Sequence, residues 1–253
     1  MATSDSLRLS PSRINDFNNC PALYKYRAIL QLPEPPSIDA ERGKMIHTVM
    51  ERLFEEPRTD RTIDRALAHL ENTWRDIQKN NPEVAALVED EIQWLIHAKA
   101  LLASYFALEN PTVFDSTHRE FHLERDFRED VYLHGYVDRI DIAPTGEVRI
   151  VDYKTGKSPK PGWEEKALFQ LRVYALLYWR NEGVIPKQLK LVYLGNENEI
   201  TSSPTESVLL STEKKLNAIA DEMLTAIETD HFPTNKTRLC DWCYFKSICP
   251  AHQ

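Results

Sequence analysis

The fold of this chain is set by residues 135–154, which read Gly-Tyr-Val-Asp-Arg-Ile-Asp-Ile-Ala-Pro-Thr-Gly-Glu-Val-Arg-Ile-Val-Asp-Tyr-Lys. Val, Ile and Tyr are frequent on both sides of the turn residues Pro144-Thr-Gly146, a pattern typical of two β-strands joined by a tight turn. A hairpin of this kind places Asp138 on one strand beside Asp152 on the next. Because side chains alternate along a strand, Lys154 shares the face of Asp152.

Two carboxylates that face one point favour a hard divalent cation such as Mg²⁺ or Mn²⁺. Such a cation polarises a phosphoryl oxygen and lowers the pKa of a bound water, and a nearby lysine stabilises developing negative charge. An Asp-x-Lys tripeptide alone is equally typical of an exposed ion pair at a strand edge. Asp152, however, lies in an apolar run, where an isolated carboxylate is costly unless it is paired or bound to metal. Asp138 at matching depth therefore favours a metal site.

Two more strings accompany the hairpin: Arg42-Gly43-x-x-x-His47 upstream and Gln170-x-x-x-Tyr174 downstream. Together with Gly-x-x-Asp-Arg-Ile-Asp and Ile-Val-Asp-Tyr-Lys-Thr-Gly, they resemble the RecB-type nuclease domain of the PD-(D/E)XK superfamily, from about residue 9 to residue 250. The resemblance implies an α/β fold, in which helices flank a central mixed β-sheet (a restriction-endonuclease-like core).

The resemblance also implies roles for individual residues. His47, Asp138 and Asp152 would be metal ligands, the carbonyl of Tyr153 would complete the protein's share of the ligands, and Lys154 would be the catalytic lysine.

Five further side chains lie close to this set in the predicted elements. Gln170 and Tyr174, one turn apart on one helix face, would contact DNA or orient the site. Glu120, on the strand before the hairpin, is a candidate for an additional carboxylate. Arg139 and Asp141 are expected to brace the hairpin rather than to touch metal.

The four cysteines are split between the two ends of the chain: Cys20, Cys240, Cys243 and Cys249. Four thiolates suit either tetrahedral zinc or a [4Fe-4S] cluster, and their spacing does not separate the two. The resemblance favours iron, because iron–sulfur members of the family, including the AddB nuclease domain and CRISPR-associated RecB-like nucleases, share this arrangement of one plus three cysteines. The cluster would act as a clasp (residues 20 and 240–249), shielded by Trp242, Tyr244 and Phe245.

The hydrophobic pattern outlines the remaining elements. We expect helices from Ser10 to about Cys20, near 24–27, and at 40–56, 62–79, 83–107, 163–182 and 211–230. We expect strands at 113–124, 131–142, 147–154, 188–195 and 206–210. The tail 235–253 has no periodicity. The helices of 40–107 would form a lobe within one nuclease domain of residues 1–253.

The composition limits the functional classes. A chain of 253 residues with 42% hydrophobic and 28% charged residues is typical of a globular protein, and no apolar run approaches the ~20 residues that a membrane span needs. The first residues do not resemble a secretory signal, so we expect a cytoplasmic protein without a membrane partner. The net charge of −8 argues against a protein that coats nucleic acid nonspecifically.

The sequence therefore predicts a metal-dependent DNA nuclease, an exonuclease that prefers single strands or ends; the resemblance implies that its product carries a 5′-phosphate. DNA repair, recombination and CRISPR adaptation are the expected settings. The chain has no G-x-x-x-x-G-K-[ST] motif, the nucleotide-binding loop of helicases. We therefore expect any helicase partner to be a separate chain, and a separate CRISPR-adaptation protein is the other expected partner. The alternative is a noncatalytic DNA-binding or scaffolding module with a structural Fe–S or zinc cluster.

Overall fold

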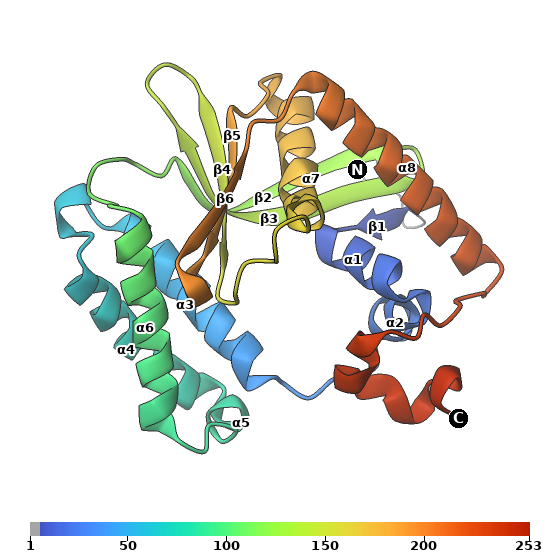
Figure 1. Cartoon of the computed structure of the whole chain (residues 1–253), viewed down its shortest axis with the longest axis horizontal. Coiled ribbons are helices and arrows are strands. Elements are labelled where there is room, and N and C mark those ends of the chain that lie inside the picture. The colour runs from blue at the N-terminus through green and yellow to red at the C-terminus, as the bar shows by residue number, and fades with distance from the viewer. Residues whose placement is uncertain (1–5) are drawn as a thin grey trace. The chain divides into compact units, whose positions relative to one another are not determined.

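A mixed β-sheet forms the centre of the protein in this computed structural model, which describes residues 6–253 (Figure 1). Its strands are β1 (Leu7–Leu9), β2 (His118–Arg128), β3 (Val131–Ile142), β4 (Val148–Lys154), β5 (Gln188–Tyr193) and β6 (Asn198–Ser202). The hydrogen-bonded order is β1-β3-β4-β5-β6, and β2 also pairs with β3. The β1–β3 and β4–β5 pairs are parallel, whereas β3–β4 and β5–β6 are antiparallel. The predicted fold class, a mixed sheet flanked by helices, is confirmed.

The helices are α1 (Pro11–Asn19), α2 (Pro21–Tyr24), α3 (Ile38–Glu55), α4 (Ile63–Asn80), α5 (Pro82–Ala85), α6 (Glu91–Leu108), α7 (Glu164–Glu182) and α8 (Glu206–Glu228). A π-helical turn covers Lys25–Ile29, and 3₁₀ turns cover Arg58–Asp60, Leu194–Asn196, Arg238–Trp242, Tyr244–Ile248 and Pro250–His252. Ser10 caps α1 as predicted, because its hydroxyl accepts the backbone N–H of Arg13. Within the described part of the chain, no helix is long and apolar enough to cross a membrane.

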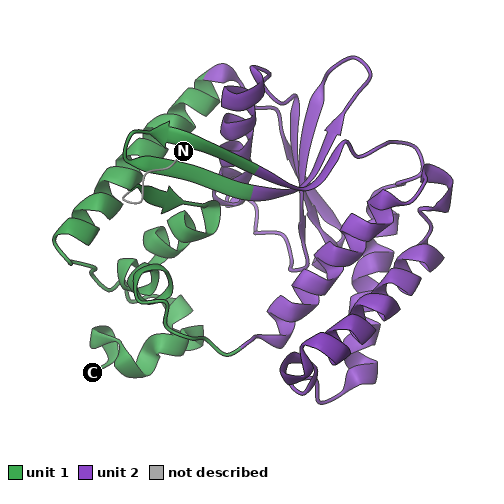
Figure 2. Cartoon of the chain, turned by 180° about the vertical axis from the view of Figure 1, so that it is seen from behind, with its two compact units in different colours: residues 1–35, 123–135, 207–253 green, residues 36–122, 136–206 purple. Residues whose placement is uncertain are grey.

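The chain divides into two compact units (Figure 2). The first comprises residues 1–35, 123–135 and 207–253, and it includes α1, α2 and all four cysteines. The second comprises residues 36–122 and 136–206 and includes α3 to α7 with β4 to β6. The candidate catalytic residues all belong to the second unit, whereas the cysteines belong to the first.

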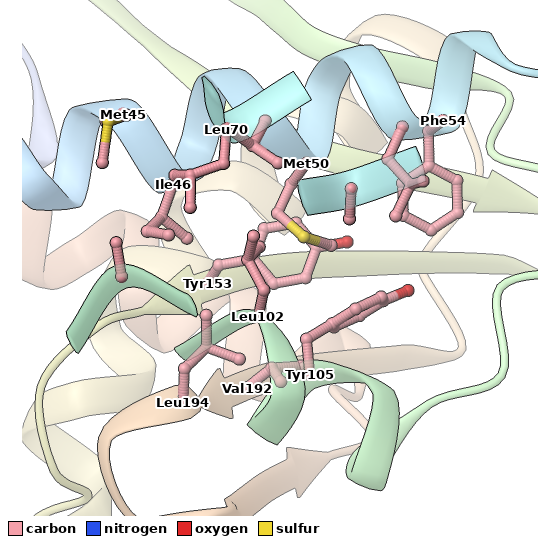
Figure 3. Packing of buried hydrophobic residues seen from close by; sticks show 14 of the residues in the cluster. Met45, Ile46, Met50, Phe54, Leu70, Leu102, Tyr105, Tyr153, Val192 and Leu194 are labelled. Atoms are coloured by element: carbon pink, nitrogen blue, oxygen red, sulfur yellow. The ribbon is translucent and has the colours of Figure 1, made fainter. Parts of the chain in front are cut away.

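The core of the second unit lies between α3, α4 and α6 on one side and strands β4 and β5 on the other (Figure 3). Met50 and Phe54 of α3 pack with Tyr153 of β4 in this core. The helices of residues 40–107 therefore share one core with the sheet. Since Tyr153 faces these helices, alternation turns its neighbours Asp152 and Lys154 to the opposite face of the sheet, where α7 packs.

The helix predicted at 83–107 is wrong as a single element, because it is divided into α5 and α6. The side chain of Asp90 accepts the backbone N–H of Gln93 at 2.9 Å and so starts α6 with its own N-cap.

The strand predicted at 206–210 is also wrong, because these residues form the first turns of α8. The strand that follows β5 is β6, and the chain reaches it through Leu194–Asn196 and a left-handed Glu197 with φ 51°. This turn folds β6 back antiparallel to β5. The three-residue strand β1 was not predicted.

Candidate active site

The hairpin of β3 and β4 places the two predicted acidic residues side by side. The strands pair from Ile142 opposite Val148 to Arg139 opposite Val151, and one more step in this register brings Asp138 opposite Asp152. The backbone N–H of Tyr153 donates to Oδ2 of Asp138 at 2.7 Å. The hydrogen bond holds the Asp138 carboxylate beside the end of β4.

His47 and Glu120 approach Asp138 from two other elements. His47, in the middle of α3, places Nδ1 3.2 Å from Oδ1 of Asp138 and 4.0 Å from Oε1 of Glu120 on β2. One ligand atom from each of the three residues lies within 4.8 Å of the others. The structure thus joins His47 and Asp138 as predicted and adds Glu120, which the sequence indicated only by its place before the hairpin.

The backbone of Glu120 contributes to this convergence. Its φ is 42°, in the left-handed region that residues other than glycine rarely adopt. Such backbone strain costs about 1–3 kcal/mol and is found mainly where surrounding structure holds it at functional sites. The irregular backbone interrupts the regular alternation of β2 at the residue that joins His47 and Asp138.

Asp152 and Lys154 form the second half of the site. Nζ of Lys154 lies 2.6 Å from Oδ2 of Asp152 and donates to Oε1 of Gln170 at 3.0 Å. The amide nitrogen of Gln170 in turn lies 3.0 Å from Oδ1 of Asp152 and 3.0 Å from the hydroxyl of Tyr174. Since Tyr174 is only 4% exposed, this geometry favours the orienting role for Gln170 and Tyr174 over contact with DNA.

The accumulated acidic groups alter one another's pKa. Burial disfavours protonation of His47, but the hydrogen bond and charge of Asp138 outweigh burial and raise the His47 pKa to about 9. Burial, and next the charge of Asp138, raise the pKa of Glu120 to about 7. Burial also raises the pKa of Asp152 to about 6, against the opposing charge of Lys154.

These residues fit a divalent cation. Imidazole nitrogen and carboxylate oxygen are ligands that Mn²⁺ accepts, and carboxylates suit Mg²⁺. Burial is the main cause of the raised pKa values of Glu120 and Asp152, and the charge of Asp138 adds to both; a bound cation would offset that charge. A cavity of about 600 Å³ opens beside the ligand atoms of His47 and Glu120 and is bordered by α3 residues such as Gly43 and Lys44.

Metal binding at this site should strengthen as the pH rises from about 6 to 9. Protons on Asp152, Glu120 and His47, with pKa values of about 6, 7 and 9, compete with the cation and are released as it binds. Calorimetric titration with Mn²⁺ at several pH values should give a Kd that falls across this window. A Kd that does not depend on pH would contradict the assignment.

The opposite face of the hairpin carries a buried ionic network. Arg139 is fully buried, and its guanidinium donates to both carboxylate oxygens of Glu109, at 2.8 and 3.1 Å. It also donates to Asp141 at 3.2 Å and contacts the hydroxyl of Tyr153. Lys190 of β5 reaches Glu109 at 2.8 Å. These contacts suit a bracing role for Arg139 and Asp141, whereas no sequence signal pointed to Glu109 or Lys190.

The four cysteines come together in the first unit. All four are free thiols and line a single cavity of about 50 Å³, with Tyr26 and His252. The backbone N–H of Asn235 donates to Sγ of Cys20 at 3.4 Å, and that of Thr237 donates to Sγ of Cys240 at 3.5 Å. Converging sulfur atoms that accept backbone hydrogen bonds fit a thiolate-bound metal or cluster.

The predicted aromatic shield is only partly correct. Phe245 is buried and packs on Tyr26, with ring centroids 5.1 Å apart. Trp242 and Tyr244 are 79% and 57% exposed. Each lies in a short 3₁₀ turn rather than in a regular element with a buried face, so these two rings are left largely in water.

Comparisons with known proteins agree with this geometry. The model of the PD-(D/E)XK nuclease superfamily matches residues 8–250. One of the subunits of the ATP-dependent helicase/deoxyribonuclease of Streptococcus pyogenes serotype M3 is 30% identical over 161 residues, which are 59% of this chain and 14% of the relative. Its counterpart from a serotype M12 strain is 29% identical over the same length. The chain thus spans about one seventh of the length of these curated relatives.

A solved structure also resembles the fold. The crystal structure of a "Putative exonuclease" from Eubacterium rectale aligns with a TM-score of 0.61 and 15% sequence identity, covering 94% of this chain and 87% of the other. At this identity the likeness shows a shared fold alone. The family match, which extends over nearly the whole chain, carries the assignment: the chain belongs to the PD-(D/E)XK nuclease superfamily.

Proposed function

We propose that this chain is a metal-dependent DNA exonuclease that prefers single strands or ends. One observation carries the proposal: His47, Glu120 and Asp138 offer ligand atoms within 4.8 Å of one another, next to the Asp152–Lys154 pair. Metal ligands beside a buried carboxylate and a lysine are the groups that phosphodiester hydrolysis requires.

Each residue has a distinct part in the proposed reaction. His47, Asp138 and Asp152, with Glu120 and the carbonyl of Tyr153, would hold Mg²⁺ or Mn²⁺. The bound cation would polarise the phosphoryl oxygen and make a water nucleophilic at neutral pH. Lys154 would stabilise the negative charge that develops on the phosphate. Gln170, anchored by Tyr174, keeps Lys154 and Asp152 in their relative positions.

The names of the curated relatives support the proposed substrate and partner. Each relative is part of a deoxyribonuclease whose name also includes a helicase, which supports DNA as the substrate. A separate helicase or a CRISPR-adaptation protein would deliver the strand, in DNA repair, recombination or CRISPR adaptation. A strand supplied by such a partner would arrive single-stranded and with an end.

Digestion of single-stranded DNA tests the proposal directly. With Mn²⁺, we expect linear strands labelled at one end to be degraded and circular strands of the same composition to persist. Equal cleavage of both forms would mean that the enzyme acts within strands and needs no end. Binding of both forms without any cleavage would instead favour the noncatalytic DNA-binding module.

We further propose that Cys20, Cys240, Cys243 and Cys249 hold a structural [4Fe-4S] cluster. The four thiols line one cavity of the first unit, and a cluster that binds one thiolate per iron would use all four. The resemblance of the sequence to iron–sulfur nucleases favours iron over zinc.

Replacement of Cys249 with serine should remove iron and lower the thermal stability of the protein. The cluster would link residues that are 229 positions apart in sequence, Cys20 and Cys249, so its loss should release the C-terminal turns. Iron and sulfide analysis with a thermal melt checks this, and Lys154→Ala serves as the control that should keep full iron content. A colourless protein that carries zinc would contradict the iron assignment.

A further inference from the structure

A pair of aromatic rings, of which Tyr136 is exposed, lies beside the candidate active site. The rings of His122 on β2 and Tyr136 on β3 are stacked, with centroids 4.6 Å apart and planes inclined by 25°. Tyr136 is 56% exposed, so burial in the core does not account for this ring. His122 covers one face of the tyrosine ring, which leaves the other face available for a planar ligand.

The position of the pair relates it to the metal ligands. Tyr136 precedes Asp138 by two residues on β3, and His122 follows Glu120 by two residues on β2. Residues two apart on a regular strand point to the same face and lie about 6.6 Å apart, which places the ring of Tyr136 on the face of Asp138. The ring contact itself places His122 beside Tyr136, and one nucleotide can bridge the distance from Tyr136 to Asp138.

A second ring contact lies on β2. The rings of His118 and Phe121 lie with centroids 4.3 Å apart, at an angle of 31°. Aromatic side chains therefore flank Glu120 on both sides in the sequence of β2. Like Tyr136 and His122, these residues belong to the second compact unit, together with the metal ligands.

We propose that the stacked pair of His122 and Tyr136 is a platform for one base of a single strand whose phosphate lies at the metal ligands. The inference rests on the proposed nuclease function and names what recognises the strand. Base-on-ring stacking is tolerant of sequence, because every base has a π-face. A base within a duplex already stacks on its neighbours, so the platform selects unpaired nucleotides.

Binding and cleavage of a short single strand test the platform. Tyr136→Ala should bind the strand about 5- to 100-fold more weakly than the unaltered protein, as expected for the loss of one base–aromatic stack. Tyr136→Phe keeps the ring and should bind normally. Ile92→Ala, which truncates a side chain that is 76% exposed on α6, is the control for a surface change elsewhere.

Strands that each contain one abasic nucleotide locate the stacked base. The unaltered protein should lose affinity and cleavage rate when the abasic nucleotide occupies one position, and Tyr136→Ala should show no such penalty. Equal binding by Tyr136→Ala and the unaltered protein, or an abasic penalty that persists in the variant, would overturn the platform. If no strand is cleaved but the difference in binding remains, the nuclease function fails while the platform stands.

Discussion

Lys154→Ala is expected to reduce DNA cleavage by about 10²- to 10³-fold, the range for removal of a group that stabilises charge in a transition state. The ammonium lies 2.6 Å from Asp152 and is held by Gln170 at 3.0 Å. Asp152 and Gln170 hold the lysine next to the proposed metal ligands, where negative charge on the phosphate would increase during the proposed attack. Single-turnover cleavage of an end-labelled strand with Mn²⁺ measures the effect.

A matched variant distinguishes a direct role of Lys154 in cleavage from the effect of removing any positive charge near the site. Lys157→Ala removes an exposed lysine three residues further along and should leave the cleavage rate within a few-fold of normal. Because Lys154→Ala also deprives the buried Asp152 of its cation, thermal unfolding and Mn²⁺ binding are measured alongside. A folded Lys154→Ala variant that binds Mn²⁺ and cleaves at the normal rate would contradict the assigned role.

Apart from His47, which the family resemblance indicated, the part of the site that the sequence predicted is the part made by local periodicity. Alternation along a strand places Asp152 and Lys154 on one face, and a tight turn brings Asp138 opposite Asp152. The i, i+4 spacing of a helix does the same for Gln170 and Tyr174, whose side chains are joined by a 3.0 Å hydrogen bond. Each of these relations spans at most one turn or one hairpin, so short-range geometry suffices to predict it.

Contacts that depend on long-range packing were not predictable in the same way. Glu109 follows α6 and meets Arg139 and Lys190 only after the helices have packed on the sheet. Glu120 reaches the metal ligands through a left-handed backbone, which no residue preference of glutamate indicates.

The error in the last strand, predicted at 206–210 but formed by β6 at Asn198–Ser202, has a different physical cause. Residues 198–202 read Asn-Glu-Ile-Thr-Ser, and they form the last strand in the hydrogen-bonded order of the sheet. A strand in that position needs few apolar side chains, so its pattern is weak. Val208-Leu209-Leu210 has the stronger apolar run but begins α8.

Arg139→Met is expected to lower the free energy of unfolding by about 3 kcal/mol, near the lower limit for breaking a buried ion pair. The guanidinium is fully buried, donates to Glu109 and lies over the rings of Phe54 and Phe114, at 4.8 and 4.9 Å. For a chain of this size the loss corresponds to a drop in Tm of about 6–12 °C. Urea denaturation followed by both tryptophan fluorescence and circular dichroism measures it.

A double-mutant cycle with Glu109→Leu identifies the source of the loss. Either single variant leaves a buried charge with fewer partners, whereas the double variant removes both charges at once. Lys190 and Asp141, the charged neighbours of the removed pair, each retain an ion-pair partner in the double variant. Lys190 lies 2.6 Å from Glu199, and Asp141 lies 2.8 Å from Arg149. The double variant should therefore lose less stability than the sum of the two singles. Strictly additive losses would mean that Arg139 stabilises the hairpin through its aromatic neighbours and not through Glu109.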